Sequence, residues 1–274
     1  MIKLIKLISG KERTLAYAIT TAIFAFVPEQ YFAKVSFSTN WSKEWNILSA
    51  RLIVFIVTFC FVHLIYNMYK QKRNKVFISG DHFSIQVEYG DLLQVSRGKI
   101  VINFDECFTT KVGEKPAEIK PMSICGQYLT QHPIDNIQYL IDEAGIKPTR
   151  GKSRYNDQDR YTPGTIVPNG NFLLMAFTKL DQNGLGCLTY DEYIDCLEKL
   201  WEQIDLRHGT NDVYIPILGS NIVRFDKDLT QQELLDIMIN SYRLSPKRMK
   251  KPYTLYIMCK KREGFSLNDI WGVE

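Results

Sequence analysis

The sequence predicts an α/β domain with a mixed sheet, preceded by a two-helix transmembrane hairpin. Between residues 76 and 274, short apolar runs alternate with helical patterns, which is typical of an α/β sandwich. Before residue 75, two long apolar segments are flanked by Lys and Arg. We therefore divide the chain into a hairpin, residues 1–75, and a domain, residues 76–274, which is long enough to bury one core.

The hairpin is predicted to span the membrane at about residues 14–32 and 47–69. The second segment includes the uncharged stretch 52–66 and is long enough to cross. The first has its apolar centre at residues 15–28, which covers only about 21 Å at 1.5 Å per residue. Lys and Arg cluster outside both segments, and the loop between them has two lysines offset by two glutamates. The positive-inside rule then predicts a multi-pass protein of the inner membrane with both termini cytoplasmic. A secretory signal peptide is disfavoured because residues 27–30 (VPEQ) offer no small-residue cleavage site.

Charge and cysteine usage narrow the function further. Residues 1–75 contain eleven Lys/Arg and three Asp/Glu, whereas residues 76–274 contain twenty-three and twenty-seven. The domain is thus mildly acidic, which disfavours nucleic acid as a partner. The six cysteines and four histidines show no metal-ligand spacing, so we expect reduced thiols in the cytosol and no metal site.

The domain elements follow from periodicity and capping signals. We expect helices at 133–144, after the Thr189 capping box and after Thr230, and a long polar loop at 146–165. Strands are expected at six apolar runs: 76–79, 83–89, 99–104, 171–178, 213–218 and 253–259.

One stretch resembles a calcium-binding loop. Residues 181–192 (DQNGLGCLTYDE) match the EF-hand template at Asp181, Asn183, Gly186 and Glu192. Leu185 stands where an oxygen ligand is required. The simpler interpretation is a turn followed by a capped helix. A calcium-responsive membrane protein stays open as an alternative.

Four turns that carry glycine are expected to follow strands, and together they suggest a phosphate site: 90–91, 123–128, 161–165 and 219–222. The apolar run 213–218 stops at Gly219, and Gly90-Asp91 follows the run 83–89. An Asp such as Asp91 can accept a hydrogen bond from an adenine amino group. No GxSxG, Walker or kinase motif is present, and Cys125 is best interpreted as a structural thiol.

These motifs together resemble a known family. The stretches GDLL, KIVINFDECF, SICGQYL, YTPGT, FLLMAFTKLD and YIPILGSNIVRF are similar to the macro-domain variant of bacterial Thoeris defence. With the two apolar segments before it, the chain resembles the transmembrane–macro effectors of type II Thoeris systems.

The resemblance implies a macro-like three-layer sandwich that senses a nucleotide of the histidine–ADP-ribose type, made from NAD by a partner TIR-domain enzyme. Ligand binding would drive homo-oligomerisation and disruption of membrane lipid, with no catalysis and no cofactor. Asp105 and Cys125 stand where relatives have Asn and His, and a carboxylate at position 105 would repel a diphosphate. The chain lacks the Asn-rich and triple-Gly loop of de-ADP-ribosylating macro domains, which implies binding without hydrolysis; a membrane-tethered ADP-ribosyl hydrolase is the alternative. The ligand-binding residues carried over are Asp91, Ser123, Gly126, Gln127, Gly164, Thr165, Gly219, Ser220, Asn221 and Ile222.

Overall fold

The computed structural model describes residues 10–34, 41–71, 73–220 and 224–270. The chain forms two compact units, Met1–Arg73 and Asn74–Glu274. The first contains α2 (Gly10–Ala25), the 3-10 helix η1 (Glu29–Lys34) and α3 (Lys43–Gln71). Within it, Phe55 of α3 makes edge-to-face contacts with Tyr17 and Phe24 of α2, with ring centroids 5.9 and 5.6 Å apart.

The predicted two-span hairpin is not confirmed. In the described part of the chain, α3 is the one helix long and apolar enough to cross a membrane, over Lys43–Ile65. The helix α2 has 16 residues, which is about 24 Å against a hydrocarbon core of about 30 Å. Pro28 ends the apolar pattern, and η1 continues the chain as a 3-10 helix.

The second unit is built on a mixed nine-stranded sheet of order β1-β2-β9-β7-β3-β5-β6-β8, with β4 paired to β5. Strands β2, β9, β7, β3 and β5 are parallel neighbours, and β1 is antiparallel to β2 at one edge. The strand bounds are β1 Lys75–Ser79, β2 Ser84–Tyr89, β3 Lys99–Asp105, β4 Ile166–Asn169, β5 Phe172–Leu180, β6 Gly186–Leu188, β7 Val213–Pro216, β8 Arg224–Phe225 and β9 Leu255–Cys259.

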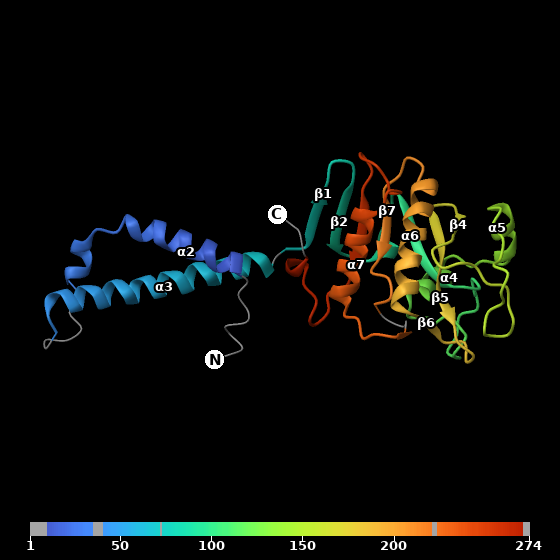
Figure 1. Cartoon of the computed structure of the whole chain (residues 1–274), viewed down its shortest axis with the longest axis horizontal. Coiled ribbons are helices and arrows are strands. Elements are labelled where there is room, and N and C mark those ends of the chain that lie inside the picture. The colour runs from blue at the N-terminus through green and yellow to red at the C-terminus, as the bar shows by residue number, and fades with distance from the viewer. Residues whose placement is uncertain (1–9, 35–40, 72, 221–223, 271–274) are drawn as a thin grey trace. The chain divides into compact units, whose positions relative to one another are not determined.

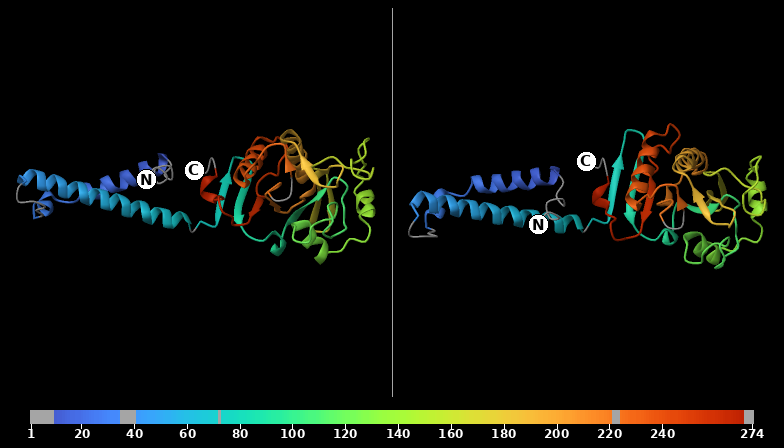
Figure 2. Two further views of the ribbon diagram at one scale, coloured as in Figure 1. Left: turned by 90° about the horizontal axis from the view of Figure 1, so that it is seen from below. Right: turned by 60° about the horizontal axis from the view of Figure 1, so that its bottom comes forward.

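Helices cover both faces of this sheet, which gives the expected three layers (Figures 1 and 2). On one face, α6 (Tyr190–Arg207) and α7 (Gln231–Leu244) pack their apolar sides on the sheet. The Nε1–H of Trp201 in α6 donates to Ser241 Oγ in α7 at 3.0 Å. On the other face, α4 (Ile124–Gln131), α5 (Ile137–Glu143) and the 3-10 helix η2 (Leu92–Gln94) enclose a second core. A last 3-10 helix, η3, is Leu267–Asp269.

Both predicted capping boxes form, at Thr189 and Thr230. The predicted helix 133–144 begins later, at Ile137, because the side chain of Asn136 caps it by accepting from Tyr139 N–H. Residues 123–128 do not follow a strand as expected: Ser123 caps α4, and the next residues are its first turns.

Candidate functional site

The candidate site lies where five parallel strands end. Because β2, β9, β7, β3 and β5 are parallel, their carboxyl ends meet at one edge of the sheet. Ligands of open α/β sheets bind at such an edge. The segments that leave these ends are Gly90–Leu92, Lys260–Arg262, Ile217–Ser220, Glu106–Phe108 and Asp181–Gly186.

Two adjoining cavities open at this edge. The larger has a volume of about 250 Å³ and the smaller about 50 Å³. They share Ile124, Pro216, Ile217 and Ser220 as lining residues, so they form one cleft with two compartments. Their combined volume lies at the lower end of the range of about 300–1,000 Å³ that is typical of small-molecule sites.

Among the residues that the structure describes, four cationic and three acidic side chains line the cleft. Lys120 and Arg224 line the larger compartment, and Lys260 and Arg262 line the smaller one. The carboxylates in the lining are Asp105, Glu118 and Asp91. Cations in a concave site attract an anionic ligand, and Arg recognises phosphate oxygens through two parallel N–H groups.

Asp91 follows β2 and lines the smaller compartment. Its Oδ1 accepts from Leu93 N–H at 3.1 Å and so caps the 3-10 helix η2. One carboxylate oxygen therefore fixes the backbone, and the group as a whole still borders the cavity.

Gly219 and Ser220 follow β7 and line the larger compartment. Gly219 has φ of +81°, a conformation that side-chain-bearing residues rarely adopt. Arg262 Nη1 donates to Ser220 O at 3.0 Å, which ties the loop to the segment after β9. The predicted partners Asn221 and Ile222 lie outside the described residues.

The α4 turn contributes Ser123 but not its glycine or glutamine. Ser123 lines the larger compartment, and its Oγ accepts from Gly126 N–H at 3.0 Å. A Cβ on Gly126 would lie 2.2 Å from Lys120 O, so glycine lets α4 pack against the preceding loop. Gln127 donates to Met122 O instead of bordering the cleft. The thiol of Cys125 lines the cavity, but burial raises its pKa well above the ordinary value, which disfavours a nucleophilic thiolate.

Gly164 and Thr165 do not join this cleft. Gly164 has φ of +89°, and a Cβ there would lie 2.6 Å from Cys196 O of α6. Thr165 is buried, and its carbonyl accepts from Ala176 N–H at 2.9 Å. These residues precede β4 instead of following a strand, and the backbone of α6 closely approaches Gly164.

Asp105, at the end of β3, is the carboxylate expected to repel a diphosphate. Its Oδ1 accepts from Cys107 N–H at 2.8 Å and from Thr109 N–H at 3.2 Å. The side chain is buried, and desolvation raises its pKa although these hydrogen bonds lower it. Asp105 thus organises the turn after β3, and its burial favours the neutral form.

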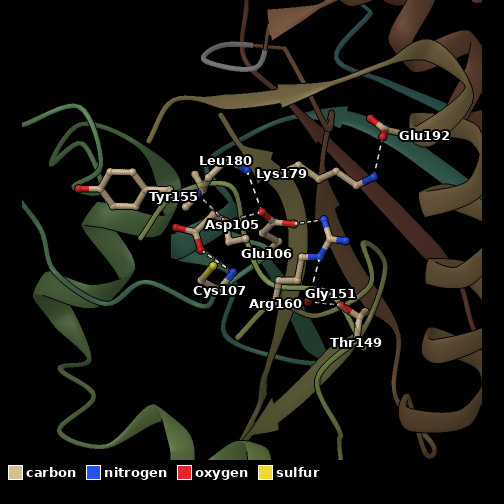
Figure 3. Close-up of polar contacts among 11 residues, drawn as sticks. Asp105, Glu106, Cys107, Thr149, Gly151, Tyr155, Arg160, Lys179, Leu180 and Glu192 are labelled. Atoms are coloured by element: carbon tan, nitrogen blue, oxygen red, sulfur yellow. Dashed lines mark hydrogen bonds and ion pairs between the residues drawn. The ribbon is translucent and has the colours of Figure 1, made fainter. Parts of the chain in front are cut away.

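The sequence analysis missed the neighbouring Glu106, which is 1% exposed. Its Oε1 accepts from Ser153 Oγ at 2.7 Å and from Leu180 N–H at 3.1 Å, and Arg160 Nη1 lies 3.9 Å from Oε2 (Figure 3). Its carbonyl accepts from Tyr161 N–H at 2.7 Å. Glu106 therefore attaches the long loop 146–165 to the ends of β3 and β5, beside the cleft. The available signal was two acidic residues directly after an apolar strand.

The calcium-like stretch forms the β5–β6 hairpin. Asp181 Oδ1 accepts from Asn183 N–H and Leu185 N–H at 2.8 and 2.9 Å. Glu192 pairs with Lys179 at 2.5 Å, as Figure 3 shows, and closes the capping box of α6. Both carboxylates of the template bind the chain's own groups, so the turn interpretation fits better. The hairpin residues Gly184, Leu185 and Gly186 line the larger compartment.

Fold and cleft together define a macro-type α/β domain with a ligand site at the carboxyl edge of its sheet. The family model described as "Thoeris protein ThsA, Macro domain" matches residues 85–260. This chain belongs to that family, which makes it a protein of Thoeris anti-phage defence. It is 27% identical over 237 residues to Thoeris protein ThsA of Bacillus amyloliquefaciens (strain Y2), covering 81% of this chain and 75% of the relative.

Solved macrodomains show more distant likeness. A mutant of the Oceanobacillus iheyensis macrodomain, solved with ADPR, aligns with a TM-score of 0.40 and 7% identity, over 69% of this chain and 91% of that one. The macrodomain of Thermus aquaticus DarG aligns with a TM-score of 0.36 and 11% identity, over 64% and 97%.

Proposed function

We propose that the domain senses an ADP-ribose-derived nucleotide, of the histidine–ADP-ribose type, made by a partner TIR-domain enzyme. The observation that carries this proposal is the cleft: a cation-lined cavity with the Gly219–Ser220 loop on one wall and Asp91 in its second compartment. Backbone amides and cations suit a diphosphate. A carboxylate acceptor suits the exocyclic amino group of adenine.

The test is calorimetry on the full chain in lipid nanodiscs, titrated with ADP-ribose and with a histidine–ADP-ribose conjugate. Asp91→Asn keeps an oxygen that can cap η2 but removes the charge, so binding should weaken while the melting temperature stays near that of the wild type. Asp195→Asn is the matched control, because Asp195 is exposed on α6 and borders neither compartment. Absence of heat at saturating concentrations of both nucleotides would refute the sensor proposal.

The proposed output is damage to a membrane after homo-oligomerisation. The helix α3 supports a membrane location: only 6% of the apolar window in its stretch Lys43–Ile65 is buried within the protein, and lipid would cover the rest. Trp41 and Trp45, 52% and 64% exposed near its start, suit an interfacial aromatic belt. We retain two spans and cytoplasmic termini in the inner membrane as a proposal, with α2 and η1 together forming the first span.

Topology is tested in spheroplasts with a membrane-impermeant maleimide. Ser42→Cys, placed just before α3, should be labelled from outside, and Asn74→Cys only after lysis. An N-terminal epitope tag distinguishes the two arrangements: it stays protected from external protease if two segments span and is digested if α3 spans alone.

A membrane-tethered ADP-ribosyl hydrolase is the alternative. The buried Cys125 and the turn-forming Asp105 favour binding without turnover. Incubation of the full chain with ADP-ribosylated protein decides between them, since release of ADP-ribose above a no-protein control would favour the hydrolase.

A further inference from the structure

The strand β1 forms one outer edge of the sheet and carries an unblocked surface. It pairs with β2 over five residues without a register shift, and it stands at the end of the strand order. Edge strands expose unpaired N–H and C=O groups that can pair with another chain, and proteins commonly protect them with short strands, Lys, Pro, bulges or inward charges. The five-residue β1 (KVFIS) carries Lys75 at its start, but it has no Pro, no bulge and no inward charge.

The hydrogen bonds between β1 and β2 identify which residues of β1 direct their backbone N–H and C=O groups away from the sheet. Tyr89 N–H donates to Asn74 O at 3.0 Å, and Gly80 N–H donates to Phe83 O at 3.1 Å. Alternate residues of an antiparallel strand bond to the same neighbour, so the even-numbered residues bond β2. The odd-numbered Lys75, Phe77 and Ser79 direct their N–H and C=O groups away, and none of the described residues pairs with them.

The outward residues also share one face of the sheet. Val76 and Ile78 are buried in the core beneath α6 and α7, whereas Lys75, Phe77 and Ser79 are exposed on the other side. Phe77, at the centre of the strand, is 54% exposed. A large apolar side chain at the middle of an unpaired edge favours contact with another protein.

We propose that β1 pairs antiparallel with β1 of a second copy of this chain, about a two-fold axis through Phe77. Phe77 then lies opposite Phe77 of the second copy, a favourable cross-strand aromatic pair. Lys75 lies opposite Ser79 and diagonal to the exposed Asp81, within reach of a long side chain.

Charge selects this arrangement over a parallel one. Parallel in-register pairing would place Lys75 against Lys75, and like charges directly opposite are destabilising. The antiparallel pairing is isologous, so both copies use the same surface and the contact closes on itself. This interface does not depend on the ligand proposal, because none of its residues lines the cleft.

Cross-linking of the full chain in membranes tests the register. Directly opposed residues in a hydrogen-bonded antiparallel pair have Cα atoms about 5.5 Å apart, within the range that a disulfide bridges. Under mild oxidation, Phe77→Cys should form a covalent dimer several-fold more than Tyr139→Cys, which is 62% exposed on α5, at the end of the domain away from β1 (Figure 1). The wild type, with its exposed Cys60, sets the background. Equal yields from the two variants, or a cross-linked band whose second chain is another protein, would overturn the proposal.

A proline variant tests the same edge through hydrogen bonding. Phe77 N–H points away from β2, so Phe77→Pro removes a donor needed only by a second copy. Mass photometry in nanodiscs should show a smaller assembly for Phe77→Pro than for Phe77→Thr, which keeps the N–H group. If Phe77→Pro does not fold, the cross-linking yields alone decide. A folded Phe77→Pro protein with unchanged assembly contradicts the proposal.

Discussion

Gly219→Val perturbs the loop after β7 in two ways at once. The residue has φ of +81°, and an added Cβ would lie 2.7 Å from Cζ of Phe225. That ring packs edge-to-face on the fully buried Tyr193, with ring centroids 5.4 Å apart. The added Cβ would therefore clash with the Phe225 ring, which the buried Tyr193 holds in place. We expect the loop after β7 to move and the core to stay fixed.

The magnitude follows from these two terms. A side-chain-bearing residue held at such a φ costs about 1–3 kcal/mol, and overpacking against the ring adds about 1–3 kcal/mol. Relief by loop movement displaces the amides of Gly219 and Ser220 from the cleft. Loss of one hydrogen bond to a charged group costs about 1.5–3 kcal/mol, so ADP-ribose should bind roughly tenfold to a hundredfold more weakly.

Gly170→Val is the matched control. Gly170 has φ of +59° with nothing within 4 Å of an added Cβ, and it lies in the β4–β5 turn outside the cleft lining. It should lose stability from the φ term alone and keep its affinity for ADP-ribose. Calorimetry and thermal melting of both full-length variants separate the two effects. Affinity of Gly219→Val within about twofold of the wild type, under conditions where the variant is fully folded, would refute the role of this loop, since 1.4 kcal/mol corresponds to tenfold.

Three further predictions concern carboxylates that the structure engages within the domain. Burial raises the pKa of Asp105 in the native state. The native protein therefore holds this proton more tightly than the unfolded chain does. As the pH rises from the pKa of the unfolded chain through the higher pKa of the native state, the contribution of Asp105 to stability falls. Asp105→Asn should therefore raise the melting temperature more at pH 7 than at pH 4, and an equal change at both would contradict it. Glu106→Ala leaves Ser153 and Leu180 N–H without their acceptor and should destabilise the domain by about 2–4 kcal/mol, measured by urea unfolding; a loss below ~0.5 kcal/mol would show that the loop is held otherwise. Millimolar calcium should not change the melting temperature, because Glu192 is engaged by Lys179; a clear rise would restore the calcium alternative.

The sequence predicted the parts of the fold that local patterns encode. Apolar runs indicated the central strands, and the Thr189 and Thr230 boxes located two helix starts, because capping involves residues only three apart. The sequence prediction misplaced residues 123–128. Gly126 could equally belong to a turn after a strand or to a helix that packs closely on Lys120 O, and the sequence alone does not distinguish these two roles. Glycine at the ends of apolar runs indicated Asp91 and Gly219, and the family resemblance assigned both to one ligand site, which spacing alone could not do.

The rest of the site required long-range contacts. Glu106 meets Leu180 across 74 residues of sequence, and no local signal specifies that pairing. Gly164 was assigned to the ligand from its motif, yet the structure gives its small size a different reason, the close approach of α6. Arg262 reaches the cleft from a segment that carried no recognised motif, and Arg224, which ends the family stretch YIPILGSNIVRF with Phe225, was not among the predicted ligand residues.

The edge strand and the ligand cleft are joined by one strand, which allows a quantitative test of coupling. The strand β2 pairs with β1 along its length and then runs directly into Gly90 and Asp91. A nucleotide that favours the paired state must itself bind more tightly to that state, and by the same factor, because linkage of binding equilibria is reciprocal. If ADP-ribose strengthens pairing tenfold, Phe77→Pro should weaken ADP-ribose binding by up to tenfold although Phe77 lies outside the cleft. Phe77→Thr, which keeps the edge donor, should fall between Phe77→Pro and the wild type. Unchanged affinity in a Phe77→Pro protein that no longer assembles would show that edge and cleft act independently.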